Sequence, residues 1–253
     1  MLLEGKTAVV YGAGGSIGRA VAKAFAQDGA RLFLTGRTEE SVQMLAKELE
    51  AEHAQVDATD PDAVEAHFAT VVGRTGGVDI SFNLISIDAI QGKELTVLGL
   101  DDYLRPIHKA TRSHFITATT AARHMANRRR GVIMALTATP ARLALPLVGG
   151  FGTAMAAIEG MMRTLAAELG PEGVRVVWLR SAGSPESFDS QVPVDSAGQP
   201  IGNEYLDTIR NQTLLKRFPR VSEIAEAATL LASDRASAIT AGTGNVTCGE
   251  VVD

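Results

Sequence analysis

The chain has 253 residues, of which 45% are hydrophobic and 21% are charged, and its net charge is −5. This length suits one large α/β domain with a well-buried core. The acidic balance argues against nucleic acid as a partner, and a lone cysteine, Cys248, excludes an intrachain disulfide and a multi-cysteine metal site. Neither a signal peptide nor a run of about 18 apolar residues is present. We therefore expect a cytoplasmic protein that does not enter a membrane.

Strand-like and helix-like segments alternate along the chain. Strands are predicted at residues 7–11, 31–35, 54–56, 78–83, 132–136, 174–179 and 245–247. Helices are predicted at residues 17–28, 39–50, 61–74, 101–127, 152–169 and 222–232. Several strands are continuous apolar runs, which is typical of strands buried on both faces. Repeated βα units pair their strands in parallel. The sequence therefore predicts an α/β fold over residues 1–253, a single doubly wound parallel sheet (Rossmann fold) with helices on both faces.

The first strand runs into a glycine-rich turn, Tyr-Gly-Ala-Gly-Gly-Ser-Ile-Gly at residues 11–18, and a helix follows. Such a turn lets the backbone approach a phosphate closely and directs the helix N-terminus at it. A tight turn without a ligand is the alternative. The place of the turn in the first βα unit favours the pyrophosphate site of a dinucleotide. The residues expected to form this site are Gly12, Gly14, Ser16, Ile17 and Gly18.

The next strands end in residues that bear on the choice of cofactor. Gly36 stands where a carboxylate would bind the ribose 2′-hydroxyl of NAD(H), and the planar guanidinium of Arg37 suits a 2′-phosphate. An ordinary surface arginine is the alternative. We expect NADP(H) to be favoured over NAD(H). Asp57, beside Ala58, is a candidate acceptor for the adenine amino group, and Asn83 ends the fourth strand beside the expected cofactor.

The helices at residues 101–127 and 152–169 are expected to form a subunit interface. The second helix is small and apolar on most of its surface, so it must be buried on more than one side. The sheet covers one side, and a second copy of the chain is expected to cover another, which gives a homo-oligomer, a dimer or a tetramer. The histidines of the first helix do not form a metal-ligating set, so no metal is expected. Lys109 on that helix is a candidate for the active cleft.

Residues 181–215 form a long segment that begins as a loop rich in glycine and proline, with a helical piece near residues 204–213. A long insertion after a late strand of an α/β sheet commonly closes over a ligand. We expect this segment to help bind a small-molecule substrate.

Together these residues resemble the short-chain dehydrogenase/reductase (SDR) family along nearly the whole chain. Residues 11–18 are similar to the family's Thr-Gly-x-x-x-Gly-x-Gly turn, with Tyr in place of Thr and Ser16 in place of the middle glycine. Asp57 matches the adenine-contacting aspartate, and Asn83 is the one residue kept from the Asn-Asn-Ala-Gly motif. Residues 173–176 and 232–242 match two later family patterns. The resemblance implies an NAD(P)-binding domain and an oxidoreductase.

The resemblance fails at the positions that carry the family's chemistry. The Tyr-x-x-x-Lys pair falls on Phe151 and Met155, the serine falls on Ala138, and the asparagine of the middle helix falls on Ala110 or Thr111. A phenol transfers a proton when a nearby cation favours its ionised form. Phe151 has no proton to transfer and Met155 has no charge. General acid–base help is worth about 10²–10⁴ in rate, so ketone reduction on this site should be slow.

Three hypotheses follow. The first is an NADP(H)-dependent oxidoreductase with a non-standard site, which transfers hydride to or from a small carbonyl, enone or imine. Thr137, Thr139 and Lys109 are its candidate replacement groups, and an iminium substrate would need little acid help. The second is a catalytically silent NADP(H)-binding homologue that acts as a sensor or partner subunit. The third is a non-redox lyase, isomerase or cyclase on the same fold. We favour the first and expect an enzyme.

Overall fold

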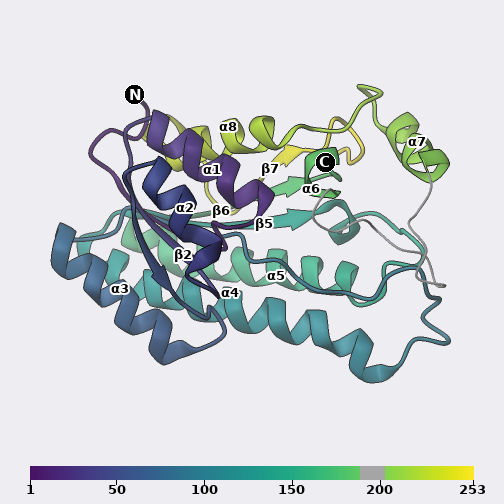
Figure 1. Ribbon diagram of the computed structural model, residues 1–253, viewed down its shortest axis with the longest axis horizontal. Helices are drawn as coiled ribbons and strands as arrows, with labels where there is room; N and C mark the ends of the chain where they lie inside the picture. The colour runs from purple at the N-terminus through teal and green to yellow at the C-terminus, as the bar shows by residue number, and fades with distance from the viewer. Residues whose placement is uncertain (189–202) are drawn as a thin grey trace.

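A computed structural model describes residues 1–188 and 203–253, and over these residues it forms one parallel seven-stranded sheet with helices on both faces (Figure 1). The strands are β1 (Thr7–Tyr11), β2 (Arg31–Gly36), β3 (Glu52–Gln55), β4 (Ile80–Asn83), β5 (Gly131–Ala138), β6 (Val174–Ser181) and β7 (Gly242–Val246). Their order in the sheet is β3-β2-β1-β4-β5-β6-β7, with every neighbouring pair parallel. The predicted doubly wound sheet is confirmed.

The helices divide between the two faces of the sheet. They are α1 (Ser16–Gln27), α2 (Glu40–Glu48), α3 (Pro61–Thr75), α4 (Leu100–Arg128), α5 (Phe151–Leu169), α6 (Pro185–Phe188), α7 (Asn203–Gln212) and α8 (Val221–Ala232). Three short 3-10 helices are η1 (Thr139–Ala141), η2 (Gly170–Glu172) and η3 (Asp234–Ala236). Helices α1, α2 and α8 cover one face and α3, α4 and α5 cover the other (Figure 1). Each face has its own hydrophobic cluster, so the central strands are apolar throughout.

Local sequence explains where individual elements begin and end. All five residues of β1 are buried, as a strand covered on both faces requires. Helix α3 begins after Asp60, whose carboxylate accepts hydrogen bonds from the N–H groups of Asp62 and Ala63 at 2.9 and 3.3 Å. Pro61 occupies its first position, and Gly76 ends it with a φ of +78°.

The two edge strands differ most from the sequence prediction. Strand β3 begins two residues earlier than predicted, at Glu52. Its side chains alternate between half-buried and exposed positions, so no apolar run marks its first residues in the sequence. Strand β7 begins three residues earlier, at Gly242, in a glycine-rich stretch that argues locally against a strand. The expected substrate segment at 181–215 lies partly outside the described residues; its described parts include α6 and α7.

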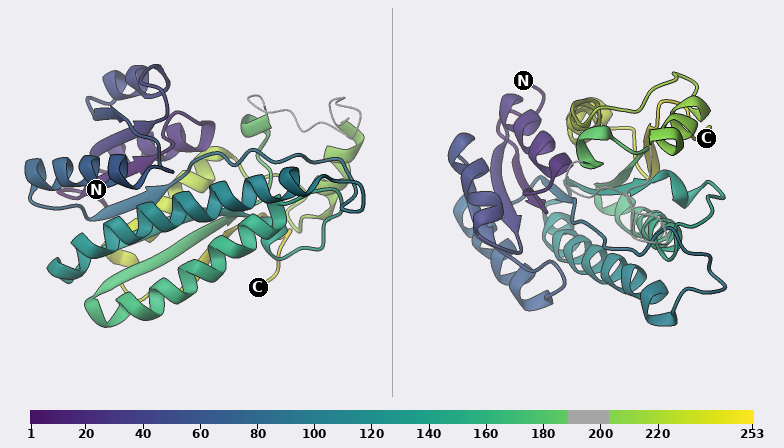
Figure 2. Two further views of the ribbon diagram at one scale, coloured as in Figure 1. Left: turned by 90° about the horizontal axis from the view of Figure 1, so that it is seen from below. Right: turned by 45° about the vertical axis from the view of Figure 1, so that its right-hand side comes forward.

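The strand register brings the carboxyl ends of the central strands to the same end of the sheet. Tyr11 at the end of β1 pairs with Thr35 on β2 and with Asn83 on β4, and Ala138 at the end of β5 pairs with Ser181 on β6. The chain builds outward from β1 in one direction and from β4 in the other, and ligands of such sheets bind outside that switch point. Figure 2 shows α4 and α5 side by side. Within the described residues, no helix is long and apolar enough to cross a membrane.

Candidate active site

The turn after β1 is shaped by glycines that no larger residue can replace. Gly12 has a φ of +75°, and a Cβ there would lie 2.7 Å from the carbonyl oxygen of Leu84. A Cβ at Gly18 would overlap the carbonyl oxygen of Gly12. The N–H groups of Gly12 and Ala13 donate to the carbonyl of Thr35 at 3.0 and 3.1 Å, which ties the turn to β2. The turn is therefore held in one compact shape.

Arg19 fastens this turn to the start of α2. Its Nε donates to the carbonyl oxygen of Gly14 at 2.9 Å, and its Nη2 donates to the carbonyl oxygen of Ser41 at 3.1 Å. A Cβ at Gly14 would lie 2.7 Å from the same carbonyl of Ser41. Gly14 thus allows α2 to approach the turn, and Arg19 holds it there.

The N-terminus of α1 fits a phosphate group. Gly15 precedes the helix, is exposed, and offers no side-chain cap, and the first turn contains no acidic residue. A Cβ at Gly15 would contact only the carbonyl oxygen of Gly12, at 3.7 Å. Uncapped N–H groups and the helix dipole attract an anion. Ser16 and Ile17, the first residues of α1, are half-buried beside this opening.

Arg37 and Asp57 lie beyond the ends of β2 and β3. Arg37 is exposed, and its carbonyl accepts a hydrogen bond from the amide of Gln55 at 3.0 Å. The N–H and hydroxyl of Thr59 donate to Asp57 at 2.9 and 2.7 Å. These bonds, helped by the charges of Arg37 and Lys109, lower the pKa of the Asp57 carboxyl. Asp57 therefore stays an anionic hydrogen-bond acceptor beyond the end of β3.

Ala58 and Lys109 complete the surroundings of Asp57. Ala58 is buried behind it. The ammonium of Lys109 on α4 pairs with Asp88 at 2.7 Å. Its charge also acts on Asp57, so Lys109 lies on the same side of the sheet end as that carboxylate.

Asn83 has both ends of its amide occupied by the protein. Its Nδ2 donates to the hydroxyl of Thr117 at 3.0 Å, and its Oδ1 accepts from the N–H of Ile85 at 3.1 Å. These bonds join β4 to α4 beneath the switch point. On the same helix, Nδ1 of the buried His114 lies 2.9 Å from the carbonyl oxygen of Ala110, and burial lowers the pKa of His114 to about 4.

Ala138, Phe151 and Met155 form an apolar wall at the ends of β5 and the beginning of α5. Phe151 and Met155 are one helical turn apart, on the same face of α5, and Met155 is buried while Phe151 and Ala138 are half-buried. All three pack against the hydrophobic cluster on the α5 side of the sheet. Gly152 lets the helix approach η1, since a Cβ there would lie 3.2 Å from the carbonyl oxygen of Pro140.

A buried network of charges lies next to this wall. Arg180 on β6 donates from Nε and Nη2 to both carboxylate oxygens of Glu159 on α5, at 2.9 and 2.8 Å. Its Nη1 donates to the carboxylate of Asp253 at 2.6 and 2.9 Å. The hydroxyl of Thr137 donates to Glu159 at 3.0 Å. Burial lowers the pKa of Arg180, but the two carboxylates more than offset that and raise it.

Thr139, directly after Ala138, faces the last residues of the chain. Its hydroxyl lies 3.4 Å from Oε1 of Glu250, and Oε2 of Glu250 is buried without a hydrogen-bond partner among the described residues. Burial raises the pKa of the Glu250 carboxyl, and the contact with Thr139 opposes that shift only in part.

Comparison with known proteins identifies the family. A family model described as Enoyl-(Acyl carrier protein) reductase matches residues 12–250. The chain belongs to the SDR family. Gluconate 5-dehydrogenase of Gluconobacter oxydans is 28% identical over 246 residues, covering 95% of this chain and 92% of that relative. Enoyl-(acyl-carrier-protein) reductase (NADH) 1 of Rhizobium meliloti is 30% identical over 257 residues, covering 98% and 91%.

A solved SDR structure from Serratia marcescens has a TM-score of 0.83 and 24% identity with both chains fully covered, so it has the same fold. The curated SDR relatives carry the names of dehydrogenases and reductases. The chain is therefore an SDR-type oxidoreductase. SDR proteins bind a nicotinamide nucleotide, and the uncapped helix and glycine turn described above fit such a group.

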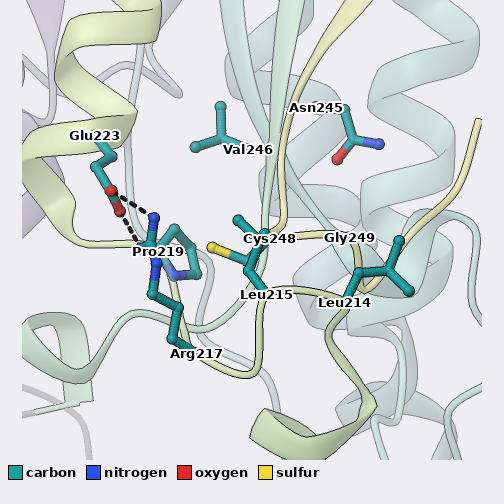
Figure 3. Close-up of a pocket in the computed structure, with 9 residues that line it drawn as sticks. All are labelled: Leu214, Leu215, Arg217, Pro219, Glu223, Asn245, Val246, Cys248 and Gly249. Atoms are coloured by element: carbon teal, nitrogen blue, oxygen red, sulfur yellow. Dashed lines mark hydrogen bonds and ion pairs between the residues drawn. The ribbon is translucent and has the colours of Figure 1, made fainter.

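A cavity of about 480 Å³ opens beside the C-terminal segment of this SDR chain (Figure 3). It is lined by Leu214, Leu215, Arg217, Pro219, Glu223, Asn245, Val246, Cys248 and Gly249. Arg217 pairs with both carboxylate oxygens of Glu223, at 2.7 and 2.8 Å, and its hydrogen bond is the main cause that lowers the pKa of Glu223 to about 2. Figure 3 shows the Cys248 sulfur directed toward Pro219. Gly249, which lines this cavity, directly precedes Glu250 in the chain.

Sequence reasoning missed four charged groups of this SDR site. Glu159 and Arg180 stand among apolar residues at buried positions of α5 and β6, and that was a usable sign, because a charge in a buried pattern needs a partner. Arg19 and Glu250 lie in ordinary polar surroundings in the sequence, so nothing local marked them. The described residues contain no group of three or more histidine, cysteine, aspartate or glutamate side chains that would hold a metal ion.

Proposed function

We propose that this SDR protein is an NADP(H)-dependent oxidoreductase with a non-standard active site, acting on a small carbonyl, enone or imine. The observation that carries the proposal is the contrast along one sheet edge. At the switch point, the glycine turn and an uncapped α1 suit a dinucleotide. At the end of β5, Ala138, Phe151 and Met155 present an apolar wall where the resemblance places a proton donor and a cation.

Different groups of the chain would bind different parts of the cofactor. The residues proposed to form its binding site are Gly12, Gly14, Ser16, Ile17, Gly18, Arg37, Asp57, Ala58 and Asn83. The N–H groups of the first turn of α1 hold the pyrophosphate, Arg37 contacts a 2′-phosphate, and Asp57 accepts from the adenine. Asn83 acts indirectly by holding Ile85 and Thr117 in place. When bound, the nicotinamide supplies a hydride.

The apolar wall restricts the substrates that react well. Ala138, Phe151 and Met155 exclude water from the reacting atoms but offer no proton. The hydroxyl of Thr137 donates to the buried Glu159, and Lys109 pairs with Asp88. Both groups are therefore weak candidates to replace the missing proton donor. Substrates that need little acid help at this wall, above all imines and iminium ions, are therefore favoured over simple ketones.

The proposal is tested by stereospecific deuterium transfer from labelled NADPH to a panel of imines, enones and ketones. We expect transfer to at least one imine, faster than to matched ketones. Cofactor binding without transfer to any member of the panel would instead favour a silent cofactor-binding homologue. The triple change Ala138→Ser, Phe151→Tyr and Met155→Lys should increase ketone reduction, by up to about 10²-fold, because it restores acid–base help. No gain with the fold and cofactor affinity intact would mean that the site differs in more than these side chains.

We also propose that the protein is a cytoplasmic homo-oligomer assembled through α4 and α5. Phe115 on α4 is 59% exposed, and Ala156 and Ala167 on the neighbouring α5 are exposed as well, so the two helices offer apolar surface for a second copy of the chain to cover. Sedimentation at micromolar concentration should show a dimer or tetramer, whereas a monomer would contradict the assembly.

A further inference from the structure

The turn that follows β7 places Glu250 near the carboxyl end of β5. Its N–H donates to the carbonyl oxygen of Thr247 at 3.1 Å, and its carboxyl reaches Thr139, the residue after Ala138. The 3.4 Å separation between Oε1 and the Thr139 hydroxyl is long for such a bond, as is common before a substrate is bound. The other oxygen, Oε2, is buried with no partner among the described residues.

The segment that carries Glu250 is held on both sides. The hydroxyl of Thr247 accepts from the N–H of Val251 at 3.2 Å, and the amide of Asn245 donates to the carbonyl of Val251 at 2.9 Å and to Asp253 at 3.0 Å. Arg180 clamps Asp253 from β6. Figure 1 shows the C-terminus at the end of the sheet where β5 and β6 end. Glu250 is therefore positioned by several bonds, not left on a free tail.

The surroundings of Glu250 favour a protonated carboxyl. Glu223, which lines the cavity together with Cys248 and Gly249, is paired with Arg217 and stays ionised. Among the described residues no cation pairs with Glu250 in this way: burial raises its pKa, and the Thr139 hydroxyl opposes the shift. The other titratable groups of the segment are the Cys248 thiol, whose pKa is raised mainly by burial, and Asp253, which is paired with Arg180.

We propose that Glu250 is the proton donor of this active site and that its substrate is an imine. This inference rests on the proposed reductase function. In the step, the O–H bond of the Glu250 carboxyl breaks and an N–H bond forms on the imine nitrogen. The products are an iminium ion and a carboxylate, which attract each other, and the carboxylate takes its proton back from solvent after the amine leaves.

The chemistry of the donor selects the nitrogen substrate. An imine nitrogen is much more basic than a ketone oxygen, so a carboxylic acid whose pKa is raised by burial can protonate it before hydride arrives. Proton transfer is most efficient when the pKa values of donor and acceptor are close. The pKa of a protonated ketone is far from that of a carboxylic acid, so this donor protonates a ketone poorly. This agrees with the absence of a phenol and an ammonium at the positions of Phe151 and Met155.

The decisive experiment compares a neutral cyclic imine with its N-methyl iminium analogue, using the full chain with NADPH. Glu250→Gln should slow reduction of the imine by about 10²-fold or more above the pKa of the free iminium, and should leave the N-methyl iminium little changed because that substrate needs no proton. Glu226→Gln, which removes an exposed carboxylate on α8, is the matched control and should alter neither rate. Equal losses on both substrates would show a merely structural role and overturn the proposal.

A second variant keeps the test valid if Glu250→Gln folds poorly. Thr139→Val removes the hydroxyl that lowers the pKa of Glu250, so the pH at which imine reduction falls off should move upward. Independently of turnover, the infrared band of a protonated carboxyl in the ligand-free protein should disappear in Glu250→Gln and titrate at higher pH in Thr139→Val. If the wild type reduces neither substrate, the reductase function and this proposal both fail. If it reduces both substrates and Glu250→Gln does so equally well, only the proton-donor role fails.

Discussion

The proposed cofactor side and the proposed catalytic side of the site, at the carboxyl ends of the strands, are built by different means. On the cofactor side, around β1 and β2, the important groups are backbone N–H groups and the spaces left by Gly12, Gly14 and Gly18. On the catalytic side, around β5 and β6, they are side chains that arrive from α5, β6 and the C-terminal segment. The first half depends on backbone conformation, and the second depends on how buried charges are paired.

This difference determines how each half responds to substitution. A backbone site is disrupted by adding atoms, because an added Cβ has no room. A buried ionic site is disrupted by removing atoms, because the remaining charge loses its partner inside a low-dielectric environment. Arg180 and Glu159, each with a side chain only 3% exposed, are the clearest case.

The largest effect is expected from Arg180→Met. The change leaves the carboxylate of Glu159 buried with only the Thr137 hydroxyl and the distant Arg163, whose Nη1 lies 3.9 Å away. The free energy of unfolding should fall by about 3–5 kcal/mol. Urea denaturation at a fixed protomer concentration measures it.

The double variant Glu159→Leu with Arg180→Met separates stability from positioning. Replacing a buried ion pair by apolar residues is often neutral or stabilising, so most of the lost stability should return. Imine reduction should return only in part, because Asp253 then keeps only its bond from Asn245 and Glu250 is held less firmly. Full recovery of both properties would mean that the clamp on Asp253 has no part in placing Glu250.

The comparison also shows which features a sequence can reveal. The order of βα units and the glycine turn follow from local spacing, and the structure has them where the pattern predicts. The edge strands β3 and β7 were less well predicted because polar and glycine residues there break the apolar pattern. The catalytic side was predicted least, since residues 137, 159, 180 and 253 come together only through the crossover connections and carry no common local pattern.

A medium effect is expected from Gly18→Ala on the cofactor side. The added Cβ would overlap the carbonyl oxygen of Gly12 and lie 2.8 Å from Cα of Ala13, so the turn must open. The Kd for NADPH should rise by about 100-fold, which corresponds to about 2.7 kcal/mol. Fluorescence titration of NADPH measures this change.

The matched control is Gly73→Ala on α3, where an added Cβ meets nothing within 4 Å. It should leave NADPH binding unchanged and stabilise the helix by about 0.5–1 kcal/mol. Equal NADPH affinity in Gly18→Ala and in the wild type would place the pyrophosphate elsewhere and remove the basis of the cofactor half.

The smallest effect is expected from Arg37→Ala, which tests the one charged contact proposed on the cofactor side. Arg37 is exposed, and a neighbouring cavity of about 390 Å³ is lined partly by Glu39 and Glu40, whose charges weaken the attraction for a phosphate. The Kd for NADPH should therefore rise only about tenfold, with NADH binding unchanged, and the difference should shrink as salt is added. Arg235→Ala, another exposed arginine, is the control and should change neither affinity. A wild type that prefers NADH, the cofactor named for the Rhizobium relative, or an equal loss for both nucleotides in Arg37→Ala, would show that the cofactor half recognises only what its backbone can bind and that no side chain there selects the 2′-phosphate.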